Sequence, residues 1–542
     1  MRANSLRLGV VMGLVALVMA VLPLLKGELI VAKHEGDTLH LADLVLRMAE
    51  AGQIPHFDFM TPLGILSIWP IAVFVQAGLG IGMAFLAAQA ALALVLFGPI
   101  LRTALSRFTG WFAWGFAAYV IVLVLALVHG EANPAISVSM HYNRWAWALA
   151  YIAIPLAMLE PLGPRRPLLD GTLIGLALAA MALIKVTYFA AFFPAIVIAL
   201  LARRDWKTLL VALLAGLTVA AAVTGIFTTR FWFAYLRDLF TVATSATRAA
   251  PGLSLGGILV APAYMAGTFA VLASVIFLRQ SGAMVAGLVL LFLMPGFVYV
   301  TYQNFGNDPQ WLILLALLAL GLRPETTRTN ALGIRLDQAL LVAGTFALAL
   351  GAASAINMIW SPFRLYFSTA EEVVPLLSQR PQHHDILVGK PRVYRVVMNQ
   401  MGWDELDTYS DYVVPLGDED TPPLAINGET LADCELSTGY NAWFETTART
   451  LEGAGYGGSG ILVADLFSAL WLYGDFKPLE GGAPWYYAGT PGLDVADHVL
   501  VPLCPTNLPR RAEILKAIET GGWTLSEEMR TETFILYRPS KG

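Results

Sequence analysis

Residues 81–101 read IGMAFLAAQAALALVLFGPIL, a stretch of 21 residues without a charged side chain. A helix of this length rises about 30 Å, which matches the hydrocarbon thickness of a bilayer. Similar apolar stretches recur along the first two thirds of the chain, so the sequence predicts a polytopic α-helical membrane protein with about eleven transmembrane helices. The other predicted spans are 8–25, 111–128, 145–159, 171–184, 186–201, 209–227, 257–278, 283–300, 311–322 and 339–359.

The composition of all 542 residues agrees with a membrane protein. Hydrophobic residues make up 57% of the chain and charged residues 13%, with a mean hydropathy of +0.65, whereas soluble chains carry about 25% charged residues. The net charge of -5 and the lack of a long basic run argue against nucleic acid as a partner. No dense cluster of His, Cys and carboxylates has the spacing of metal ligands, so no metal or other cofactor is predicted.

The positions of the cationic residues orient the predicted spans. All of the cationic residues that flank the spans lie on one face of the membrane if the apolar segment 62–79 does not cross it. The positive-inside rule makes that face cytoplasmic. We therefore expect a multi-pass protein of the plasma (inner) membrane with a cytoplasmic N-terminus, and segment 62–79 in the outer interface. Residues 1–359 then form the transmembrane module. The cationic residues are Arg2, Arg7, Arg102, Arg107, Arg165, Arg166, Arg203, Arg204, Lys207, Arg279, Arg323, Arg328 and Arg335.

After residue 359 the composition shifts to Asp, Glu, Pro and Gly with short apolar runs, as in a water-soluble domain. Residues 360–542 are predicted to form an extracytoplasmic (periplasmic) α/β domain, with strands at 385–389, 460–465, 498–503 and 532–537 and a helix at 512–520. Cys434 and Cys504 both fall in this domain. In an oxidising compartment they could form a disulfide, and two unpaired buried thiols are the alternative.

The first external loop, residues 26–80, holds charged residues at helical spacing. From residue 38 to 50 a polar stripe of His40, Asp43, Arg47 and Glu50 opposes an apolar face, which predicts an amphipathic juxtamembrane helix on the membrane surface. Asp37 stands where this helix begins. Its carboxylate can cap the helix N-terminus, or it can take a proton from an acceptor hydroxyl, and both interpretations stay open.

A second group in this loop is His56 and Asp58, which we take as candidate substrate-binding residues together with His40. For Asp58 the alternative is a turn-forming aspartate before Thr61 and Pro62.

At this point the chain resembles the GT-C class of integral membrane glycosyltransferases, in the branch of lipid A aminoarabinose transferases and protein O-mannosyltransferases. The resemblance rests on the motifs Glu35-Gly36-Asp37 and Thr61-Pro62-Leu63-Gly64 and on the layout of residues 8–322. It implies that Asp37 is the catalytic base. Thr61 replaces a lysine that is frequent in the family, which weakens any contact of this turn with a phosphate.

The resemblance also implies the ligands of the donor phosphate. Lys185 matches a family lysine between two spans, and Arg144 offers a permanent charge with several donors; snorkelling of the lysine and interfacial anchoring of the arginine are the alternatives. Asn143 stands where the family places a second acid, and we take it as a further candidate substrate-binding residue.

The segment 302–310 supplies further candidates for sugar binding, namely Gln303, Asn304 and Asp308, with a simple turn as the alternative.

Taken together, these resemblances imply an inverting transferase that moves a sugar from a polyprenyl-phosphate donor to an envelope lipid, glycan or protein at the outer membrane face. A transporter or flippase of a lipid-linked saccharide is the alternative function. The lack of internal repeats and the few charges within the spans weigh against it.

Overall fold

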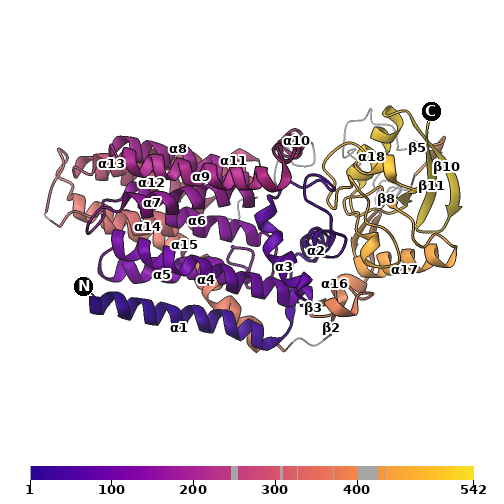
Figure 1. The fold of residues 1–542 in the computed structure, drawn as a ribbon, viewed down its shortest axis with the longest axis horizontal. Helices are drawn as coiled ribbons and strands as arrows, with labels where there is room; N and C mark the ends of the chain where they lie inside the picture. The colour runs from indigo at the N-terminus through magenta and orange to yellow at the C-terminus, as the bar shows by residue number, and fades with distance from the viewer. Residues whose placement is uncertain are drawn as a thin grey trace, which may run out of the picture. The chain divides into compact units, whose positions relative to one another are not determined.

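The computed structural model describes residues 2–245, 254–304, 309–325, 327–369, 372–400, 425–431 and 434–542. The chain forms two compact units (Figure 1). The helical unit comprises Met1–His34, Leu63–Phe233 and Ala250–Thr369, and the C-terminal unit comprises Glu35–Pro62, Ala234–Ala249 and Ala370–Gly542. The C-terminal unit therefore includes part of the first predicted loop in addition to the end of the chain.

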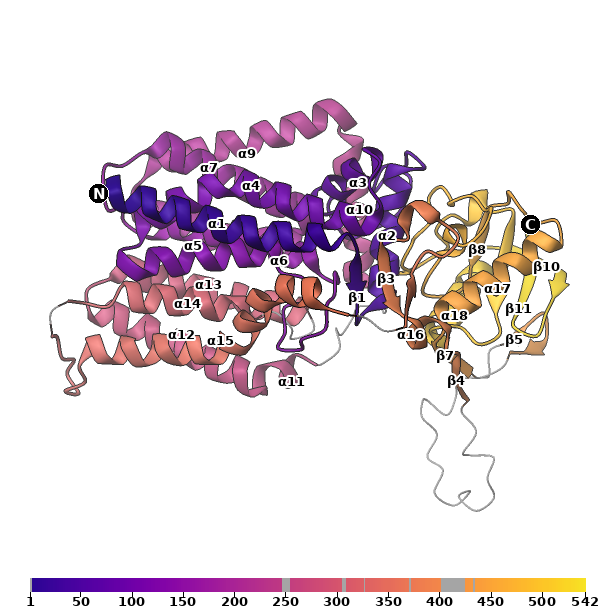
Figure 2. The same ribbon diagram turned by 90° about the horizontal axis from the view of Figure 1, so that it is seen from below.

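Long helices lie side by side to form the helical unit (Figure 2). Short pieces, β1 (Leu29–Val31), η1 (Ile65–Ser67), α3 (Trp69–Gln76) and α11 (Leu255–Val260), join them. The helices of the bundle are α1 (Arg2–Lys26), α4 (Ile81–Arg107), α5 (Gly110–Leu125), α6 (His141–Met158), α7 (Pro167–Ile184), α8 (Val186–Ala202), α9 (Trp206–Phe227), α12 (Pro262–Gln280), α13 (Met284–Gln303), α14 (Gln310–Gly321) and α15 (Leu336–Phe367).

Every predicted span is helical, and the chain is an integral membrane protein. Among the described residues, seven helices are long and apolar enough to cross a bilayer, namely α1, α4, α7, α9, α12, α13 and α15, while the apolar helices α5, α8 and α14 are shorter. The predicted span 257–278 is two helices, because Ala261 is extended and Pro262 starts α12. Segment 62–79 contains only η1 and the eight-residue α3, which rises about 12 Å and is too short to cross.

Helices α7 and α9 pack through small residues. A Cβ atom added to Gly175 of α7 would lie 2.2 Å from the carbonyl oxygen of Ala212, and one added to Gly171 would lie 2.7 Å from that of Thr208. The glycines let the two backbones touch, as is common between helices in lipid.

The C-terminal unit contains a four-stranded sheet in the order β10-β11-β9-β8. β8 (Ile461–Val463) and β9 (His498–Pro502) are parallel, whereas β9, β11 (Phe534–Lys541) and β10 (Trp523–Arg530) are antiparallel neighbours. Helix α18 (Leu508–Thr520) buries Ile514, Leu515 and Ile518 against this sheet. The predicted α/β domain and its strands at 460–465, 498–503 and 532–537 are thus confirmed.

Smaller elements complete the C-terminal unit. The predicted strand 385–389 is β3 (Ile386–Gly389), which pairs with β2 (Val373–Pro375). The others are α2 (Glu35–Ala49), α16 (Lys390–Tyr394), β4 (Val397–Gln400), β5 (Ala425–Ile426), β6 (Glu429–Thr430), β7 (Cys434–Thr438) and α17 (Tyr440–Gly453), and α10 (Arg230–Thr244) connects the units.

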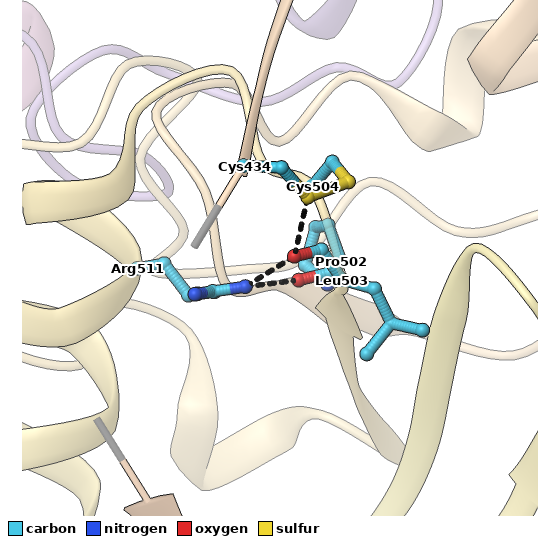
Figure 3. Close-up of a disulfide and its surroundings, with 5 residues drawn as sticks. All are labelled: Cys434, Pro502, Leu503, Cys504 and Arg511. Carbon is cyan, nitrogen blue, oxygen red and sulfur yellow. Dashed lines mark hydrogen bonds between the residues drawn. A yellow bond between two sulfur atoms is a disulfide. The ribbon is translucent and has the colours of Figure 1, made fainter. Parts of the chain in front are cut away.

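Cys434 and Cys504 form a disulfide across a sequence separation of 70 residues, as Figure 3 shows. It ties the start of β7 to the chain just after β9. Beside it, the guanidinium of Arg511 donates hydrogen bonds to the carbonyl oxygens of Pro502 and Leu503. The pairing that the sequence left open is therefore settled in favour of the disulfide.

The polar stripe of α2 is buried at its middle. His40 is partly exposed and Glu50 is exposed, whereas Asp43 and Arg47 are buried, so the prediction of a polar face on the membrane surface is wrong for these two residues. Asp43 and Arg47 are 0% and 1% exposed, form an ion pair of 2.7 Å and are enclosed by the C-terminal unit. The indole Nε1 of Trp471 donates to Asp43, and Arg47 donates to the carbonyl oxygen of Leu479. Because a buried charge needs partners, the stripe fixes α2 to the C-terminal unit.

Candidate active site

One group of candidate residues, in the helical unit, centres on Lys185. This residue is extended (φ -155°, ψ 108°) and separates α7 from α8. Its Nζ donates hydrogen bonds to Oδ1 of Asn143 at 2.9 Å and to Oδ1 of Asn304 at 2.5 Å, and it lies 5.2 Å from the centre of the Tyr142 ring. Both amides are neutral, so they orient the ammonium group without cancelling its charge.

The two asparagines are themselves buried. Asn143 is 3% exposed and lies in the first turn of α6, and Asn304 is 0% exposed and directly follows α13 as its C-cap. Asn304 also donates to the hydroxyl of Tyr188 on α8. The end of α13, the start of α6 and the α7–α8 break thus meet at the ammonium group of Lys185. Asn143 and Asn304, which the sequence offered as sugar ligands, contact this lysine.

The Thr61-Pro62-Leu63-Gly64 turn packs against the end of α7, next to Lys185. The amide of Gly64 donates to the carbonyl oxygen of Ile184 at 3.0 Å, and a Cβ atom on Gly64 would lie 2.1 Å from the carbonyl oxygen of Leu183. Only glycine allows this approach to the end of α7. The imidazole of His141, the first residue of α6, is 3.0 Å from the carbonyl oxygen of Ser67 in η1. Residues 63–67 therefore contact both the end of α7, which precedes Lys185, and the start of α6.

Arg144 follows Asn143 and is buried, with 1% of its surface exposed. Its guanidinium donates to the carbonyl oxygens of Ala126 and Val128, which follow the end of α5. This contact is typical of an arginine that caps the C-terminus of a helix.

The loop between α5 and α6 is electropositive. Burial and, in decreasing order, the neighbouring charges of His34, Arg144, Lys33 and Lys185 together lower the pKa of His129 to about 3. The His34 and His129 rings lie 4.6 Å apart, and Lys33 pairs with Glu131 at 2.9 Å. Glu131 is thus the partner of a lysine.

A separate group of candidate residues, in the C-terminal unit, contains Asp37. This residue lies in the first turn of α2, which begins at Glu35, so the interpretation of Asp37 as the residue capping this helix is wrong. A carboxylate in the first turn still interacts favourably with the positive end of the helix dipole.

Aromatic side chains surround this end of α2. The rings of His40 and Trp485 lie 5.4 Å apart, Phe467 packs edge-on against Trp485 at 5.0 Å, and Tyr440 lies 5.8 Å from Phe467. Asp37, His40, Tyr440 and Trp485 are each partly exposed. Burial raises the pKa of Tyr440 to about 12, with smaller contributions from Glu35, Asp465 and Asp37. The contact of Trp485 with α2 depends on the fold, because His40 and Trp485 are far apart in the sequence.

His56 lies elsewhere in the C-terminal unit and is 1% exposed. Its Nδ1 is 3.0 Å from Oδ2 of Asp238 on α10, and its ring contacts Tyr235 at 4.5 Å. Arg237 donates to the carbonyl oxygen of His56 and to Asp238. These contacts attach the loop 54–62 to α10.

The remaining predicted residues have separate surroundings. Asp58 accepts a hydrogen bond from the amide of Ile54 at 2.7 Å, as expected for a turn. Gln303 is the last residue of α13 and is partly exposed, and Asp308 lies outside the described residues. Over the described residues no group of three His, Cys, Asp or Glu side chains could hold a metal ion.

Comparisons with known proteins yield two similar solved structures. No family model matches the chain, and no curated protein sequence does. The crystal structures of ArnT from Cupriavidus metallidurans, in the apo state and bound to undecaprenyl phosphate, align with TM-scores of 0.37 and 0.35 and identities of 13% and 14%. Each alignment covers 97% of this chain and 97% of the ArnT chain.

Proposed function

We propose that the chain is a membrane glycosyltransferase that moves a sugar from a polyprenyl-phosphate donor to an acceptor of the cell envelope. The observation that carries this proposal is the ammonium group of Lys185, which two amide oxygens from two other helices fix at the break between α7 and α8. A fixed positive charge at the end of apolar helices suits the phosphate of a lipid whose chain stays in the bilayer. The motif Glu35-Gly36-Asp37 supports the same activity by resemblance.

The surroundings of Lys185 also favour an anion. The depressed pKa of His129 reflects nearby positive charges in addition to burial, and a phosphate placed there would be attracted by Arg144 and Lys185. Because Arg144 donates to two backbone carbonyls, we assign it a long-range electrostatic role and Lys185 the direct contact.

The reaction that we propose is a single displacement at the anomeric carbon. Asp37 removes the proton of the acceptor hydroxyl, the acceptor oxygen bonds to the anomeric carbon, and the bond from this carbon to the phosphate oxygen breaks with inversion. The bonding electrons leave with the polyprenyl phosphate, whose charge Lys185 stabilises. The aromatic rings of Trp485 and Tyr440 offer a surface for the sugar or acceptor next to Asp37.

The proposed location is the plasma (inner) membrane, with the N-terminus in the cytoplasm and the C-terminal unit outside. The Cys434–Cys504 disulfide supports this sidedness, because disulfides persist in oxidising compartments and are rare in the cytosol. The distribution of arginines between spans gives the same orientation.

The test is transfer of a labelled sugar from a polyprenyl-phosphate donor by the purified full-length protein in proteoliposomes. Lys185→Gln should lower kcat/KM by about 10²-fold, the usual effect of removing one group that stabilises charge in a transition state. Lys207→Gln, which removes an exposed lysine of the same unit, should leave it unchanged. Donor that crosses the bilayer chemically intact, without transfer or hydrolysis, would identify a flippase and refute the proposal.

Asp37 is tested in the same assay. Asp37→Asn should reduce kcat with little change in donor binding, because the amide cannot accept the proton. Asp494→Asn, which changes an acid whose side chain is 83% exposed, is the matched control. Full turnover by a well-folded Asp37→Asn variant would remove Asp37 from the mechanism.

A further inference from the structure

A cavity of about 420 Å³ lies in the helical unit, beside Arg107 at the end of α4 and Arg203 at the end of α8. It belongs to neither group of candidate active-site residues. Its wall is mostly apolar, with Phe108, Phe112, Leu317 and Leu318 among the lining residues, but two arginines, Arg107 and Arg203, also line it.

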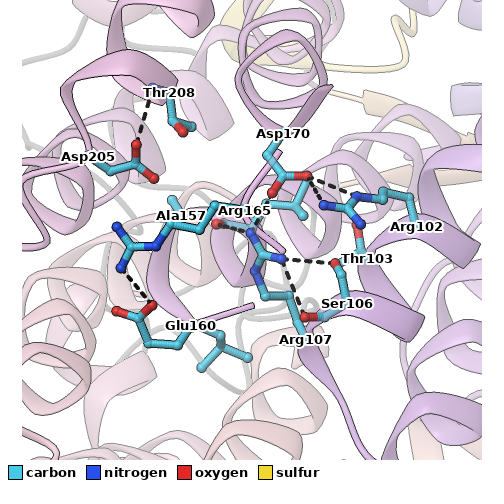
Figure 4. A network of polar contacts seen from close by, with 12 residues as sticks. Arg102, Thr103, Ser106, Arg107, Ala157, Glu160, Arg165, Asp170, Asp205 and Thr208 are labelled. Atoms are coloured by element: carbon cyan, nitrogen blue, oxygen red, sulfur yellow. Dashed lines mark hydrogen bonds and ion pairs between the residues drawn. The ribbon is translucent and has the colours of Figure 1, made fainter. Parts of the chain in front are cut away.

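Both arginines are buried and held by the protein. The side chains of Arg107 and Arg203 are 3% and 5% exposed. Arg107 donates to Asp170, to Ser106 and to the carbonyl oxygen of Leu156 (Figure 4). Arg203 donates to the carbonyl oxygens of Ala157 and Leu159 and pairs with Glu160. Among the described residues, the Nε atom of each arginine has no hydrogen-bond partner.

The positive charge around this cavity exceeds the negative charge. Arg102 and Arg107 share the carboxylate of Asp170, as Figure 4 shows. Arg165 and Arg203 share the carboxylate of Glu160, which also lines the cavity. Of the charged residues that line the cavity, Arg107 and Arg203 are buried cations and Glu160 is an anion whose side chain is 66% exposed, so an additional anion is favoured beside the two guanidinium groups.

Two helices begin at the cavity wall without side-chain caps. Thr109 precedes α5 and Ala283 precedes α13, and neither side chain makes a capping hydrogen bond. Both residues line the cavity. The first amides of a helix lack partners within the helix, and the dipole adds positive potential there, so these two ends strengthen the preference for an anion.

We propose that this cavity binds the phosphate of an anionic glycerophospholipid from the adjacent leaflet. The arginines and the two helix N-termini attract the headgroup, and the apolar wall accommodates the first part of an acyl chain. Such a lipid would join the ends of α5, α6, α8, α13 and α14, so its binding stabilises the helical unit. This inference is independent of the glycosyltransferase proposal.

The test uses full-length protein in a mild detergent, with native mass spectrometry and thermal unfolding as measurements. Phosphatidylglycerol should bind and raise the unfolding temperature, whereas phosphatidylcholine should not. Thr109→Asp and Ala283→Asp each place a carboxylate at the cavity while providing a good helix cap, so these variants should fold and bind phosphatidylglycerol about tenfold more weakly.

The matched control is Ser254→Asp, which adds the same charge at the exposed N-terminus of α11, where Ser254 already caps the helix. It should bind the lipid as the unchanged protein does. Equal stabilisation by phosphatidylcholine, equal stabilisation by inorganic phosphate alone, or full binding by both aspartate variants would each overturn the assignment of the cavity to an anionic phospholipid.

Discussion

At the scale of single residues, Asn143 contacts Lys185 through a neutral amide, which leaves the charge of the lysine uncompensated by this residue. Asn143→Asp would place a carboxylate 2.9 Å from the ammonium group and neutralise it, so we expect the KM for a polyprenyl-phosphate donor to rise and kcat/KM to fall by about 10-fold or more. Asn143→Ala removes the hydrogen bond but keeps the charge and should lose less. An aspartate variant as active as the alanine variant would contradict this role of Asn143.

His129 gives the protein a specific sensitivity to acid. Its pKa is about 3 in the folded protein and about 6.5 in the unfolded chain. As pH falls from 6.5 towards 3, only the unfolded chain takes up this proton, so the free energy of unfolding decreases by up to about 1.4 kcal/mol per pH unit. Above pH 6.5 both states are neutral at this residue and its contribution is constant.

The check is the thermal unfolding temperature between pH 7.5 and 5. His129→Gln removes the titrating group and should flatten this dependence, whatever its effect on absolute stability. His384→Gln, which replaces an exposed histidine, should leave the slope as it is. Parallel slopes for the unchanged protein and His129→Gln would show that His129 does not couple folding to protons.

Residue-level prediction from sequence is possible where the signal is local. Lys185 is conspicuous because a charge interrupts two apolar runs. The sequence could not reveal that Asn143 and Asn304 hold it, because these residues come from α6 and α13 and meet only after the helices pack. Likewise, Trp485 and His40 are far apart in sequence and meet only in the folded C-terminal unit.

At the scale of elements, the contact of α7 and α9 depends on glycine at one position. A Cβ atom on Gly175 would lie 2.2 Å from a backbone oxygen and 2.8 Å from the Cβ atom of Ala215. Gly175→Ala should therefore separate the two helices and destabilise the protein by about 1–3 kcal/mol. Gly216→Ala, whose Cβ atom would lie 3.7 Å from its nearest neighbour, should be tolerated. Equal unfolding temperatures in detergent for both variants would argue against this packing.

Helices were predictable because lipid forces backbone hydrogen bonds into the helix and leaves long apolar runs as the signal. The amphipathic pattern of α2 was ambiguous in a different way. A polar stripe can face water or buried polar partners, and here Asp43 and Arg47 meet Trp471 and the carbonyl oxygen of Leu479, more than 400 residues later in the chain. The periodicity predicted that this segment is a helix, but it could not predict what the polar face of the helix contacts.

At the scale of the whole molecule, the disulfide links the stability of the C-terminal unit to the compartment that the chain enters. The cross-link closes a loop of 70 residues, which restricts the unfolded chain and stabilises the folded unit by about 2–4 kcal/mol. Replacing both cysteines by serine should lower the unfolding temperature of this unit, and a reductant should destabilise the unchanged protein but not the double variant. Limited proteolysis follows this unit separately from the helices.

The same pair of cysteines reports on sidedness in intact cells. On the external side both thiols are oxidised, so a maleimide applied after denaturation without reductant should label neither, and prior reduction should expose both to labelling. In the cytosol the pair would remain reduced and label directly. Direct labelling of the unchanged protein would therefore place the C-terminal unit on the cytoplasmic side. Asp37 belongs to that unit, so the proposed base would then be separated from an acceptor at the outer face.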